Sequence, residues 1–390
     1  MISVEEAKKL VTENISPLNV VFKPLHQASG FTLAEDINGR YDIPAFRQSS
    51  MDGYAIGLGD IGQALNLIGE MAAGSGNKLT LKSGEAIRIF TGAPVPEGAD
   101  TVVMQEKTVK NGNHISVVDD KLVLGANIRA VGSEIRAGAM AMRKGSFLTP
   151  AALAYLAGIG TSAVKVFSVP RVAIILTGNE LQEPGLPLAF GKVYESNSYS
   201  LSAALRNVGV TEIEILQAED TLDKLTRVLD SALKNNDVVL LTGGVSVGDY
   251  DFVIKAAENC HVEQIFHKVK QKPGKPLYFG KQNEKVIFGL PGNPSSVLSC
   301  YYNYVLPALK KLSGMETAEM EIKGELTHGY SKPKGLTHFL KGNFADGKAI
   351  PLGAQESYRL SSFAQANCLI ELDQEQEVFS AGEMVKVILI

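Results

Sequence analysis

The segment DVVLLTGGVSVGDYD, residues 237–251, indicates which class of fold the chain adopts. Its first part is a short apolar run bounded by turn residues, which predicts a fully buried β-strand. Gly243 and Gly244 allow a sharp turn after the strand, so that backbone N–H groups can approach a ligand closely. Ser246 adds a hydroxyl and Asp251 adds a carboxylate. Open α/β sheets bind ligands beyond the carboxyl ends of their strands, so the segment predicts a site for a phosphate and a metal ion.

The residues around this segment predict a parallel sheet. The elements expected are a strand at 172–176, a helix at 197–209, a strand formed by IEIL, a helix at 222–234 and the strand at 237–241. Alternating strands and helices are typical of a parallel sheet with right-handed crossovers. Because both the first and the last of these strands end in Thr-Gly, we expect their turns, with Glu180 and Asp251, to meet at one mouth of the sheet.

Lysines alternate in HKVKQKPGKPLYFG, residues 267–280. In an extended segment Lys268, Lys270 and Lys272 point to one face, where they repel one another unless they meet solvent or an anion. They can also protect an edge strand from aggregation, so this alternative stays open. Two prolines flank Lys275 in a stiff PGKP turn, which favours an anion site.

Another buried strand is expected at VIFGL, directly before PGNP at residues 291–294. This turn then lies beyond the strand's carboxyl end, as the Thr-Gly turns do. We expect Ser295 to cap the long helix that follows, and the first amides of this helix to hold a phosphate.

Two further parts of the chain have the composition of β-structure. Between residues 58 and 142, short apolar strands are separated by Gly, Pro, Asn and Asp, which predicts an all-β unit with a Thr-Gly turn at Thr91. From residue 323 onward the same pattern predicts a small β-barrel or sandwich, with Lys341 and Ser357 as polar candidates. Asp52 lies before the first unit, in a loop that is either a fixed site loop or a turn between domains.

Composition and charge exclude several classes of protein. With 390 residues, 45% of them hydrophobic and 21% charged, the chain is long enough for two to four globular domains. The net charge of -4 argues against nonspecific binding of nucleic acid. The three cysteines are too scattered for a disulfide framework or a clustered metal site, so we expect buried, reduced thiols. Without a secretory signal pattern or a membrane-spanning run, we expect a cytoplasmic protein that makes no membrane contact.

Seven motifs of the chain together resemble those of a known family. In chain order they are DIPAFRQSSMDGYA, TGAPVPEGAD, TGNEL, TGGVSVGDYD, KPGKP, GLPGNP and SYRLSSFAQAN. Their order is similar to that in the molybdenum insertases, or molybdopterin molybdenumtransferases, a family that includes the E domain of gephyrin. Because the motifs span nearly the whole chain, the resemblance is far more specific than any single glycine-rich turn.

The resemblance implies an α/β multidomain fold. Its parts are an N-terminal segmented domain, a β-rich inserted domain, a three-layer parallel-sheet domain that binds molybdopterin, and a C-terminal β-barrel. The expected boundaries are 1–53 with 139–170, then 54–138, 171–320 and 321–390, in that order. The resemblance also implies a homodimer, in which the α/β domain of one subunit and parts of the other build each site.

The reaction implied by the resemblance is the insertion of molybdate into the dithiolene of adenylylated molybdopterin, with Mg²⁺, cleavage of the adenylate and release of AMP. Insertion of tungstate is an alternative, and so is a carrier or scaffold that holds molybdopterin without chemistry. The implied donor and acceptor partners are a molybdopterin adenylyltransferase and molybdoenzyme apoproteins.

The resemblance also assigns roles to individual residues. The catalytic candidates are Asp52, Glu180, Asp251, Lys268, Lys272 and Lys275, of which Glu180 and Asp251 are the metal candidates. The candidates for binding the substrate are Thr91, Thr177, Asp220, Gly243, Gly244, Ser246, Pro291, Asn293, Pro294, Lys341 and Ser357. Simple chemistry agrees with most of these roles, because lysines neutralise phosphate and molybdate, amides bind phosphate, and carboxylates with phosphates hold Mg²⁺.

Two residues depart from the pattern of the family. Glu134 stands where the family has Asp, and Lys341 stands where it has Arg, a change that removes two-pronged binding of an anion. Arg129 and Arg136, near Glu134, favour a surface ion-pair network over the wall of a site. The remaining alternative for all these candidates is that they form structural turns in a dimeric α/β protein.

Overall fold

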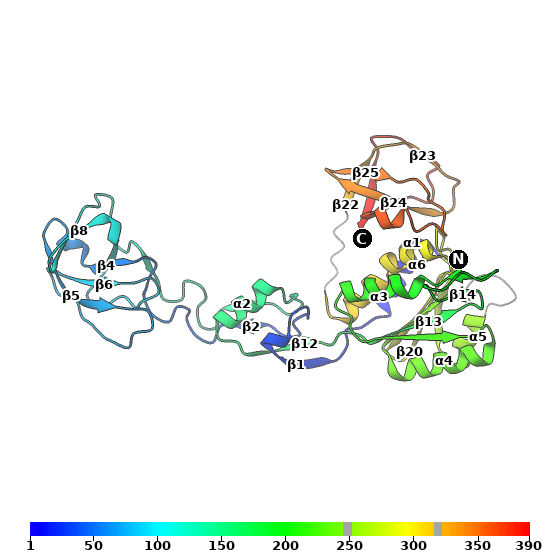
Figure 1. The fold of residues 1–390 in the computed structure, drawn as a ribbon, viewed down its shortest axis with the longest axis horizontal. Helices are drawn as coiled ribbons and strands as arrows, with labels where there is room; N and C mark the ends of the chain where they lie inside the picture. Colours follow the sequence, from blue (N-terminus) through cyan, green and yellow to red (C-terminus); the bar gives the residue numbers. More distant parts are fainter. Residues whose placement is uncertain (245–251, 316–321) are drawn as a thin grey trace.

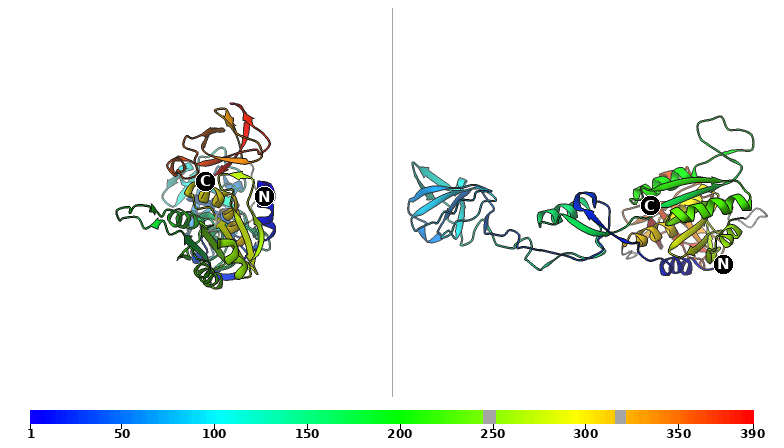
Figure 2. Two further views of the ribbon diagram at one scale, coloured as in Figure 1. Left: turned by 90° about the vertical axis from the view of Figure 1, so that its right-hand side faces the viewer. Right: turned by 90° about the horizontal axis from the view of Figure 1, so that it is seen from below.

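The computed structural model describes residues 1–244, 252–315 and 322–390. It shows an elongated molecule (Figures 1 and 2). A β-rich domain lies at one end, an α/β domain with an adjoining C-terminal barrel lies at the other, and a slender segmented domain joins the two ends. The multidomain α/β fold expected from the sequence is confirmed.

The α/β domain is built on a six-stranded sheet with the order β16-β13-β17-β21-β20-β18. Its strands are β13 (Val172–Thr177), β16 (Ile213–Ala218), β17 (Val238–Thr242), β18 (Glu263–His267), β20 (Tyr278–Gln282) and β21 (Lys285–Leu290). The first four in this order are parallel, as predicted. β20 and β18 extend the sheet antiparallel, so it is mixed rather than wholly parallel. Antiparallel neighbours need only short turns, and without a crossover helix the sequence pattern did not reveal these two strands.

Helices cover both faces of this sheet and make three layers. One face carries α1 (Val4–Glu13), α3 (Asn197–Asn207), α6 (Pro294–Cys300) and α7 (Leu306–Leu312), and the other carries α4 (Leu222–Asn235) and α5 (Phe252–Asn259). Along β13, Ile174 and Leu176 belong to the first core, whereas Ala173 and Ile175 belong to the second. A strand buried on both faces has no polar face, which is why it reads as an unbroken apolar run.

Helix α1 packs on the α/β domain. Ser3 caps its N-terminus, since the Ser3 hydroxyl accepts a hydrogen bond from the Glu6 N–H at 3.0 Å. Val4, Ala7 and Val11 are buried in the core that α7 also lines. The boundary expected at residue 53 assigns this helix to the segmented domain, so the structure differs there: the amphipathic face of α1 is buried against the α/β core.

The segmented domain is made of two stretches of chain that lie side by side. β1 (Val20–Pro24) pairs antiparallel with β12 (Ala163–Phe167), and β2 (Ile37–Asn38) pairs with β11 (Met140–Met142). Helix α2 (Pro150–Gly158) begins after Thr149, whose hydroxyl accepts from the Ala152 N–H at 3.1 Å. The chain therefore passes out to the β-rich domain and returns beside its own outgoing path (Figure 1).

The β-rich domain contains a six-stranded sheet with the order β7-β4-β6-β5-β9-β8. Its strands are β4 (Gly53–Ile56), β5 (Leu65–Met71), β6 (Glu85–Ile89), β7 (Thr101–Met104), β8 (Thr108–Asn111) and β9 (His114–Val117). Next to this sheet, β3 (Gln48–Ser49) pairs with β10 (Ile128–Arg129). The all-β prediction for this part of the chain is confirmed.

The C-terminal domain is a closed barrel, which decides between the two β-folds left open by the sequence. Its strands are β22 (Ile322–Leu326), β24 (Thr337–Ala345), β25 (Lys348–Pro351), β26 (Cys368–Leu372) and β28 (Met384–Leu389). Closure occurs because β24 pairs with β26 as well as with β25. The short strand β19 (Gln271–Lys272) of the α/β domain also pairs with β24, and this ladder attaches the barrel. Nowhere in the described part of the chain is a helix both long and apolar enough to cross a bilayer.

Candidate active site

Three strand ends meet at one edge of the α/β sheet. The Thr177 hydroxyl donates to the Thr242 carbonyl at 3.1 Å, and the Gly243 N–H donates to the Leu290 carbonyl at 3.2 Å. β13, β17 and β21 are parallel neighbours, so the turns that follow them open on the same side. The expectation that the Thr-Gly turns meet is confirmed, and the PGNP turn after β21 joins them.

The turn after β17 requires glycine. Gly243 has φ +86 and Gly244 has φ +63, a region of backbone conformation that favours glycine. A Cβ atom at Gly243 would lie 2.8 Å from both the carbonyl oxygen and the hydroxyl oxygen of Thr177. A Cβ at Gly292, in the PGNP turn, would lie 3.7 Å from the Cα of Gly243. The absence of side chains thus lets three backbone segments approach one another.

Carboxylates lie beside the turn after β13. A Cβ on Gly178 would lie 2.7 Å from a carboxylate oxygen of Glu180, so the Glu180 side chain folds back over this turn. From the neighbouring strand end, Asp220 Oδ2 accepts a hydrogen bond from the Asn179 N–H at 3.3 Å. Glu180 and Asp220 therefore flank the same turn from adjacent strand ends.

These carboxylates can supply part of a magnesium site. Mg²⁺ is usually held by one or two carboxylates together with substrate phosphates and water. Glu180 fits this chemistry, because it is exposed and its carboxylate contacts no hydrogen-bond donor or cation of another described residue. Asp251 and Ser246 lie outside the described residues. Within 1–244, 252–315 and 322–390, no three His, Cys, Asp or Glu side chains gather closely enough to hold a metal by themselves.

The lysine-rich segment links two domains. Lys268, Lys270 and Lys272 alternate with the buried Val269 and Gln271, but the segment is not extended throughout as the prediction assumed, since Lys268 has φ +70 and Lys270 lies in a bend. β19 is only two residues long and pairs with the barrel, while the residues before it pair with the N-terminal residues of the chain. The segment is therefore not a long exposed edge, which weakens the alternative that its lysines only protect an edge strand.

A buried hydrogen-bond network holds the PGKP turn from beneath. The Gln271 amide donates to the Gly274 carbonyl at 3.0 Å and accepts a hydrogen bond from the Tyr304 hydroxyl. Gln271, Cys300 and Tyr304 are at most 1% exposed. A Cβ on Gly274 would lie 2.5 Å from Cys300 Sγ, so only glycine lets the turn sit this close. The turn that presents Lys275 is thus fixed by groups below it.

This network also brings the PGKP turn close to the strand ends. A Cβ on Gly274 would lie 3.7 Å from the Ser296 carbonyl oxygen, in the first turn of α6, which directly follows the PGNP turn. A π-helix, Tyr301–Val305, continues α6 and supplies Tyr304. Such irregularities within helices are frequent at functional sites. Burial raises the pKa of the Cys300 thiol to about 12, so the thiol stays protonated.

We predict that Tyr304→Phe loosens the PGKP turn. The substitution leaves the Gln271 amide oxygen buried without a donor, a loss worth about 1–3 kcal/mol. Cys300 should then react roughly tenfold faster with a thiol reagent, as about 1.4 kcal/mol corresponds to a factor of ten. The reacted cysteine is identified by peptide mass spectrometry.

The matched control for this prediction is Tyr301→Phe. It removes a hydroxyl from the same π-helix that donates to the Ala204 carbonyl at 2.9 Å, away from the PGKP turn. Equal labelling of Cys300 in the two variants would show that the Tyr304 hydrogen bond does not fix the turn.

The imidazole of His338 lies beside Lys272, because the two residues are partners in the ladder of β19 and β24. Burial, and then the neighbouring charges of Lys272 and Lys332, lower the pKa of His338 to about 4. His338 is therefore neutral near pH 7. An anion bound here would therefore meet the positive charge of Lys272, because His338 carries none.

The PGNP turn contacts a loop of the barrel domain. The Asn293 amide donates to the Ser357 hydroxyl at 2.8 Å, and the Ser295 N–H donates to the Ser357 carbonyl at 3.1 Å. The structure thus brings Asn293, Pro291, Pro294 and Ser357 together, as the resemblance implies.

The capping expectation for this helix was wrong. Asn293 occupies the N-cap position of α6, and the hydroxyl of Ser295 is buried without a partner among the described residues. The Ser295 N–H binds the Ser357 carbonyl, and the N–H groups of Ser296 and Val297 bind the Asn293 carbonyl. Because these amides are already engaged, the start of α6 does not hold a phosphate as we expected from the sequence.

Lys341 has a different role from the one expected. Its ammonium group donates to the carbonyls of Ala354 at 2.7 Å, Glu356 at 3.3 Å and Arg359 at 3.0 Å, and the residue is 2% exposed. Burial lowers the pKa of Lys341. The ammonium group therefore holds the loop that carries Ser357 and does not face a substrate directly. This chain has Lys where the family has Arg, and this replacement therefore affects how the loop is held, not a direct contact with substrate.

Asp52 and Thr91 form a separate pair. The Thr91 N–H and hydroxyl both donate to Asp52 Oδ1 at 2.8 Å, and these hydrogen bonds, the backbone one first, lower the pKa of Asp52. Asp52 directly precedes β4, which lies at the opposite end of the elongated molecule from β13 (Figure 1). Within one chain, the pair therefore lies far from the strand ends.

The predicted ion-pair network in the β-rich domain is absent from the described residues. Arg129, Glu134 and Arg136 make no ion pair with one another, and Arg129 Nη1 instead donates to Gln48 Oε1 at 3.2 Å. The three free thiols, Cys260, Cys300 and Cys368, are buried, as expected from their spacing.

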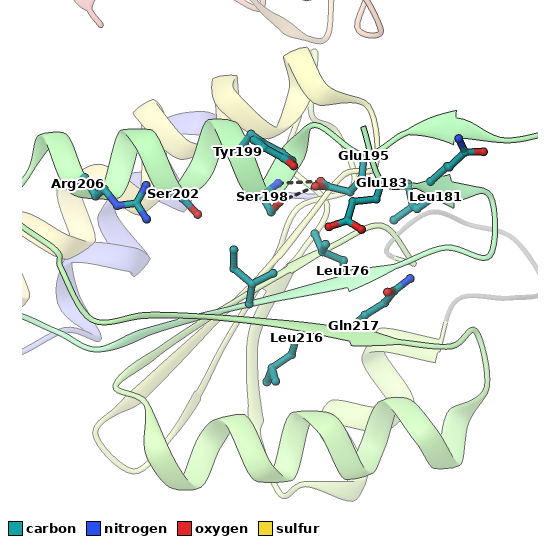
Figure 3. A pocket seen from close by; sticks show the side chains of 12 residues that line it. Leu176, Leu181, Glu183, Glu195, Ser198, Tyr199, Ser202, Arg206, Leu216 and Gln217 are labelled. Carbon is teal, nitrogen blue, oxygen red and sulfur yellow. Dashed lines mark hydrogen bonds between the residues drawn. The ribbon is translucent and has the colours of Figure 1, made fainter. Parts of the chain in front are cut away.

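Two cavities beside the strand ends were missed by sequence reasoning. They flank β14 (Leu181–Gln182) and β15 (Val193–Tyr194), two short strands that pair in parallel, and the loop between these strands projects from the α/β domain (Figure 2). The cavity on the α4 side, of about 550 Å³, is lined by Asn179, Lys192 and Arg227 among others. The cavity on the α3 side, of about 580 Å³, is shown in Figure 3. The sequence signal that could have revealed the cavity on the α3 side is ESNS, residues 195–198, in which an acidic residue and a serine lie three positions apart at the start of a helix.

Three family descriptions match successive parts of the chain. "MoeA N-terminal region (domain I and II)" matches residues 2–160, "Probable molybdopterin binding domain" matches 173–311, and "MoeA C-terminal region (domain IV)" matches 323–390. Together these ranges cover nearly the whole sequence.

Full-length relatives carry one name. A molybdopterin molybdenumtransferase of Haemophilus influenzae is 33% identical over 398 residues, covering 99% of this chain and 98% of the relative. One of Staphylococcus epidermidis is 35% identical over 401 residues, covering 100% of this chain and 95% of the relative.

Solved structures agree with the fold. A molybdopterin biosynthesis MoeA protein of Pyrococcus horikoshii OT3 has a TM-score of 0.84 and 31% identity, with 100% of both chains covered. A molybdenum cofactor biosynthesis protein of Pyrococcus furiosus, with a TM-score of 0.61 and 22% identity over both full chains, supports the fold alone.

Proposed function

Because this chain belongs to the molybdopterin molybdenumtransferase family, we propose that it inserts molybdate into adenylylated molybdopterin and releases AMP. The observation that carries this proposal is the meeting of three strand-end turns with the PGKP turn and the Ser357 loop. Glycine turns, an exposed carboxylate and the PGKP turn that carries Lys275 then lie near one edge of the sheet. This is where an open α/β sheet binds its ligand.

In this proposal, positively charged side chains and backbone amides bind the negatively charged parts of the substrates. Lys272 and Lys275 neutralise molybdate and the phosphates of the substrate, since ammonium groups bind oxyanions by charge-assisted hydrogen bonds. The Gly243 N–H is engaged by the Leu290 carbonyl, so the Gly244 amide, with Ser246, binds the pyrophosphate region. Lys268 adds a further positive charge along the same face.

Further residues hold the site in shape. Thr177 closes the two Thr-Gly turns against each other, and Asp220 fixes the turn before Glu180. The pair of Pro291 and Pro294 stiffens the turn that presents Asn293 to Ser357.

We propose that Glu180 and Asp251 hold Mg²⁺ together with the substrate phosphates. When bound, this ion polarises the phosphoryl oxygens and orients the group that attacks the adenylate bond. The protein residues contribute by fixing the anhydride against the turns and by placing molybdate beside the dithiolene.

The site that we propose is shared between two subunits. Asp52 and Thr91 lie far from the strand ends of their own chain, so in a homodimer they serve the site of the other subunit. A molybdopterin adenylyltransferase is the proposed donor of substrate, and molybdoenzyme apoproteins are the proposed acceptors of product. A cytoplasmic location agrees with the three reduced, buried thiols.

The proposal is tested by incubating the purified protein with adenylylated molybdopterin, Mg²⁺ and molybdate. We expect release of AMP and formation of molybdenum cofactor, and no release when Mg²⁺ is chelated. Competition between molybdate and tungstate in the same assay decides which oxyanion the protein prefers. Tight binding of molybdopterin without release of AMP would favour the carrier function.

A further inference from the structure

A cavity of about 580 Å³ opens beside the strand ends, between α3, the edge strand β16 and the short parallel pair β14 and β15 (Figure 3). Its volume lies within the range of small-molecule sites, about 300–1,000 Å³. Leu176 and Gln217, which line it, are partners in the ladder of β13 and β16, one position before those strands end. The cavity therefore adjoins the turns that we assign to the pyrophosphate.

The lower part of the cavity is apolar. Leu176 and Ile215 line it from the face of the sheet that α3 covers, since Ile215 is the ladder partner of Ile174 in the first core. Tyr199 lines it from α3 (Figure 3). An aromatic ring of a ligand can pack between aliphatic side chains on one side and a tyrosine on the other. These walls suit a flat, neutral ring system.

One fixed carboxylate lies at the upper part of the cavity. Glu195 is 8% exposed, and its two oxygens accept hydrogen bonds from the Ser198 N–H at 2.8 Å and the Ser198 hydroxyl at 2.5 Å. These bonds set the orientation of the carboxylate, which has further lone pairs for a ligand. Glu195 is therefore an acceptor prepared for donors that enter the cavity.

An unpartnered hydroxyl lies one turn along the same helix. Ser202 is 5% exposed, lines the cavity, and its Oγ has no hydrogen-bond partner among the described residues. Buried polar atoms are nearly always paired with protein, water or a ligand. Ser202 thus marks a second point at which a ligand can form a hydrogen bond.

The charges of the cavity indicate the class of ligand. Glu183 and Glu195 both line it and outnumber the single cation Arg206, so a free anion is disfavoured. Carboxylates instead bind edges that carry two adjacent N–H donors, in two-pronged hydrogen bonds. The 2-amino-4-oxo edge of a pterin has this pattern, whereas adenine presents an acceptor nitrogen next to its amino group.

We propose that this cavity binds the pterin ring of the substrate, with Glu195 recognising its 2-amino edge. The inference rests on the proposed function, because that function supplies a pterin substrate whose phosphate end lies at the neighbouring turns. Ser202 then bonds a second polar atom of the ring, and Tyr199 covers its face.

The test compares two probes with the full-length protein. Pterin carries the 2-amino group, and lumazine has an oxo group in its place, so the second probe lacks one donor. We expect the wild-type protein to bind pterin at least about tenfold more tightly than lumazine, measured by fluorescence titration. Glu195→Gln should abolish this preference, because the Gln side chain replaces one acceptor oxygen with an NH2 donor, and this donor would face an N–H donor of the pterin. The matched control Glu183→Gln alters a second carboxylate of the cavity and should keep the preference.

A second variant and a second readout separate the outcomes. Ser198→Ala keeps the Glu195 carboxylate but frees it from its hydroxyl donor, and should reduce the preference for pterin by a few fold. In the AMP-release assay, Glu195→Gln should raise KM for adenylylated molybdopterin while kcat changes less.

The failure of this inference differs from the failure of the proposed function. Equal binding of pterin and lumazine by the wild-type protein, or an unchanged preference in Glu195→Gln with intact folding, overturns the pterin assignment. Preferential binding of AMP in the cavity overturns it as well. A preference for pterin without any release of AMP leaves the cavity assigned and removes the insertase function.

Discussion

Mixed dimers of Lys275→Ala and Asp52→Ala chains are expected to regain roughly half of wild-type activity, although each variant alone is nearly inactive. Lys275 lies on the PGKP turn. Asp52 accepts a hydrogen bond from the Thr91 N–H next to β4, at the other end of the elongated molecule (Figure 1). Loss of either group should lower turnover by about 100-fold, the scale seen when one stabilising donor is removed from a reaction site.

The expected recovery follows from the arrangement of a shared site. In a mixed dimer, one site receives both defects and the other receives none. One of its two sites is therefore intact, so isolated mixed dimers should show about half of wild-type activity. The measurement is AMP release by co-expressed, doubly tagged dimers, with each homodimer as control.

A site built within one chain predicts a different result. Every chain of the mixture then carries one defect, and no mixed dimer regains activity. Activity of the tagged mixed dimers no higher than that of the two homodimers would therefore rule out a site shared in this way between the subunits.

Lys341→Met is expected to lower the free energy of unfolding of the barrel domain by roughly 2–4 kcal/mol, because it leaves buried carbonyl groups without donors. The ammonium group of Lys341 binds the carbonyls of Ala354, Glu356 and Arg359, which form one loop. The backbone of Lys341 is also paired with the Gln355 side chain, at 2.9 Å and 2.8 Å.

The same substitution should impair turnover through Ser357. This residue lies in the loop held by Lys341 and accepts the hydrogen bonds of Asn293 and of the Ser295 N–H. When the loop detaches, the PGNP turn loses both contacts, and AMP release should fall by about tenfold or more, since two hydrogen bonds are lost.

Lys348→Met is the matched control. Lys348 lies on the neighbouring strand β25 but is exposed, so its loss should change stability by less than about 0.5 kcal/mol. Both variants are compared by urea denaturation and by AMP release. If Lys341→Met is as stable as the wild-type protein but inactive, Lys341 contacts substrate after all, as the family pattern implied.

Most of the fold was readable from the sequence because each element carries its own periodicity. β13 and β17 are unbroken apolar runs because both of their faces are buried, and α4 shows one apolar face because only one side meets the sheet. The strands β18 and β20 lack such a signature, since an antiparallel addition at the edge needs no helix between its strands. The placement of α1 was also not readable, because an apolar face does not say which core it will join.

The sequence by itself determined which residues can do chemistry at the mouth of the sheet. Thr177, Gly243 and Glu180 follow strands, and parallel neighbours end at the same edge, so their meeting follows from the order of elements. The alternation of the lysines with buried residues was also readable, but the left-handed backbone at Lys268, with φ +70, was not.

Only the tertiary structure decided what each candidate contacts. Lys341 and Ser295 are polar residues in motifs, yet Lys341 is enclosed by its own loop and the amide of Ser295 is engaged by Ser357. Glu195 and Ser202 lie outside the motifs read for function, yet they line the same cavity because α3 packs beside the edge strand. Periodicity along a chain specifies the direction of a side chain, whereas its partners depend on segments that approach from elsewhere in the sequence, and those contacts exist only once the core has packed.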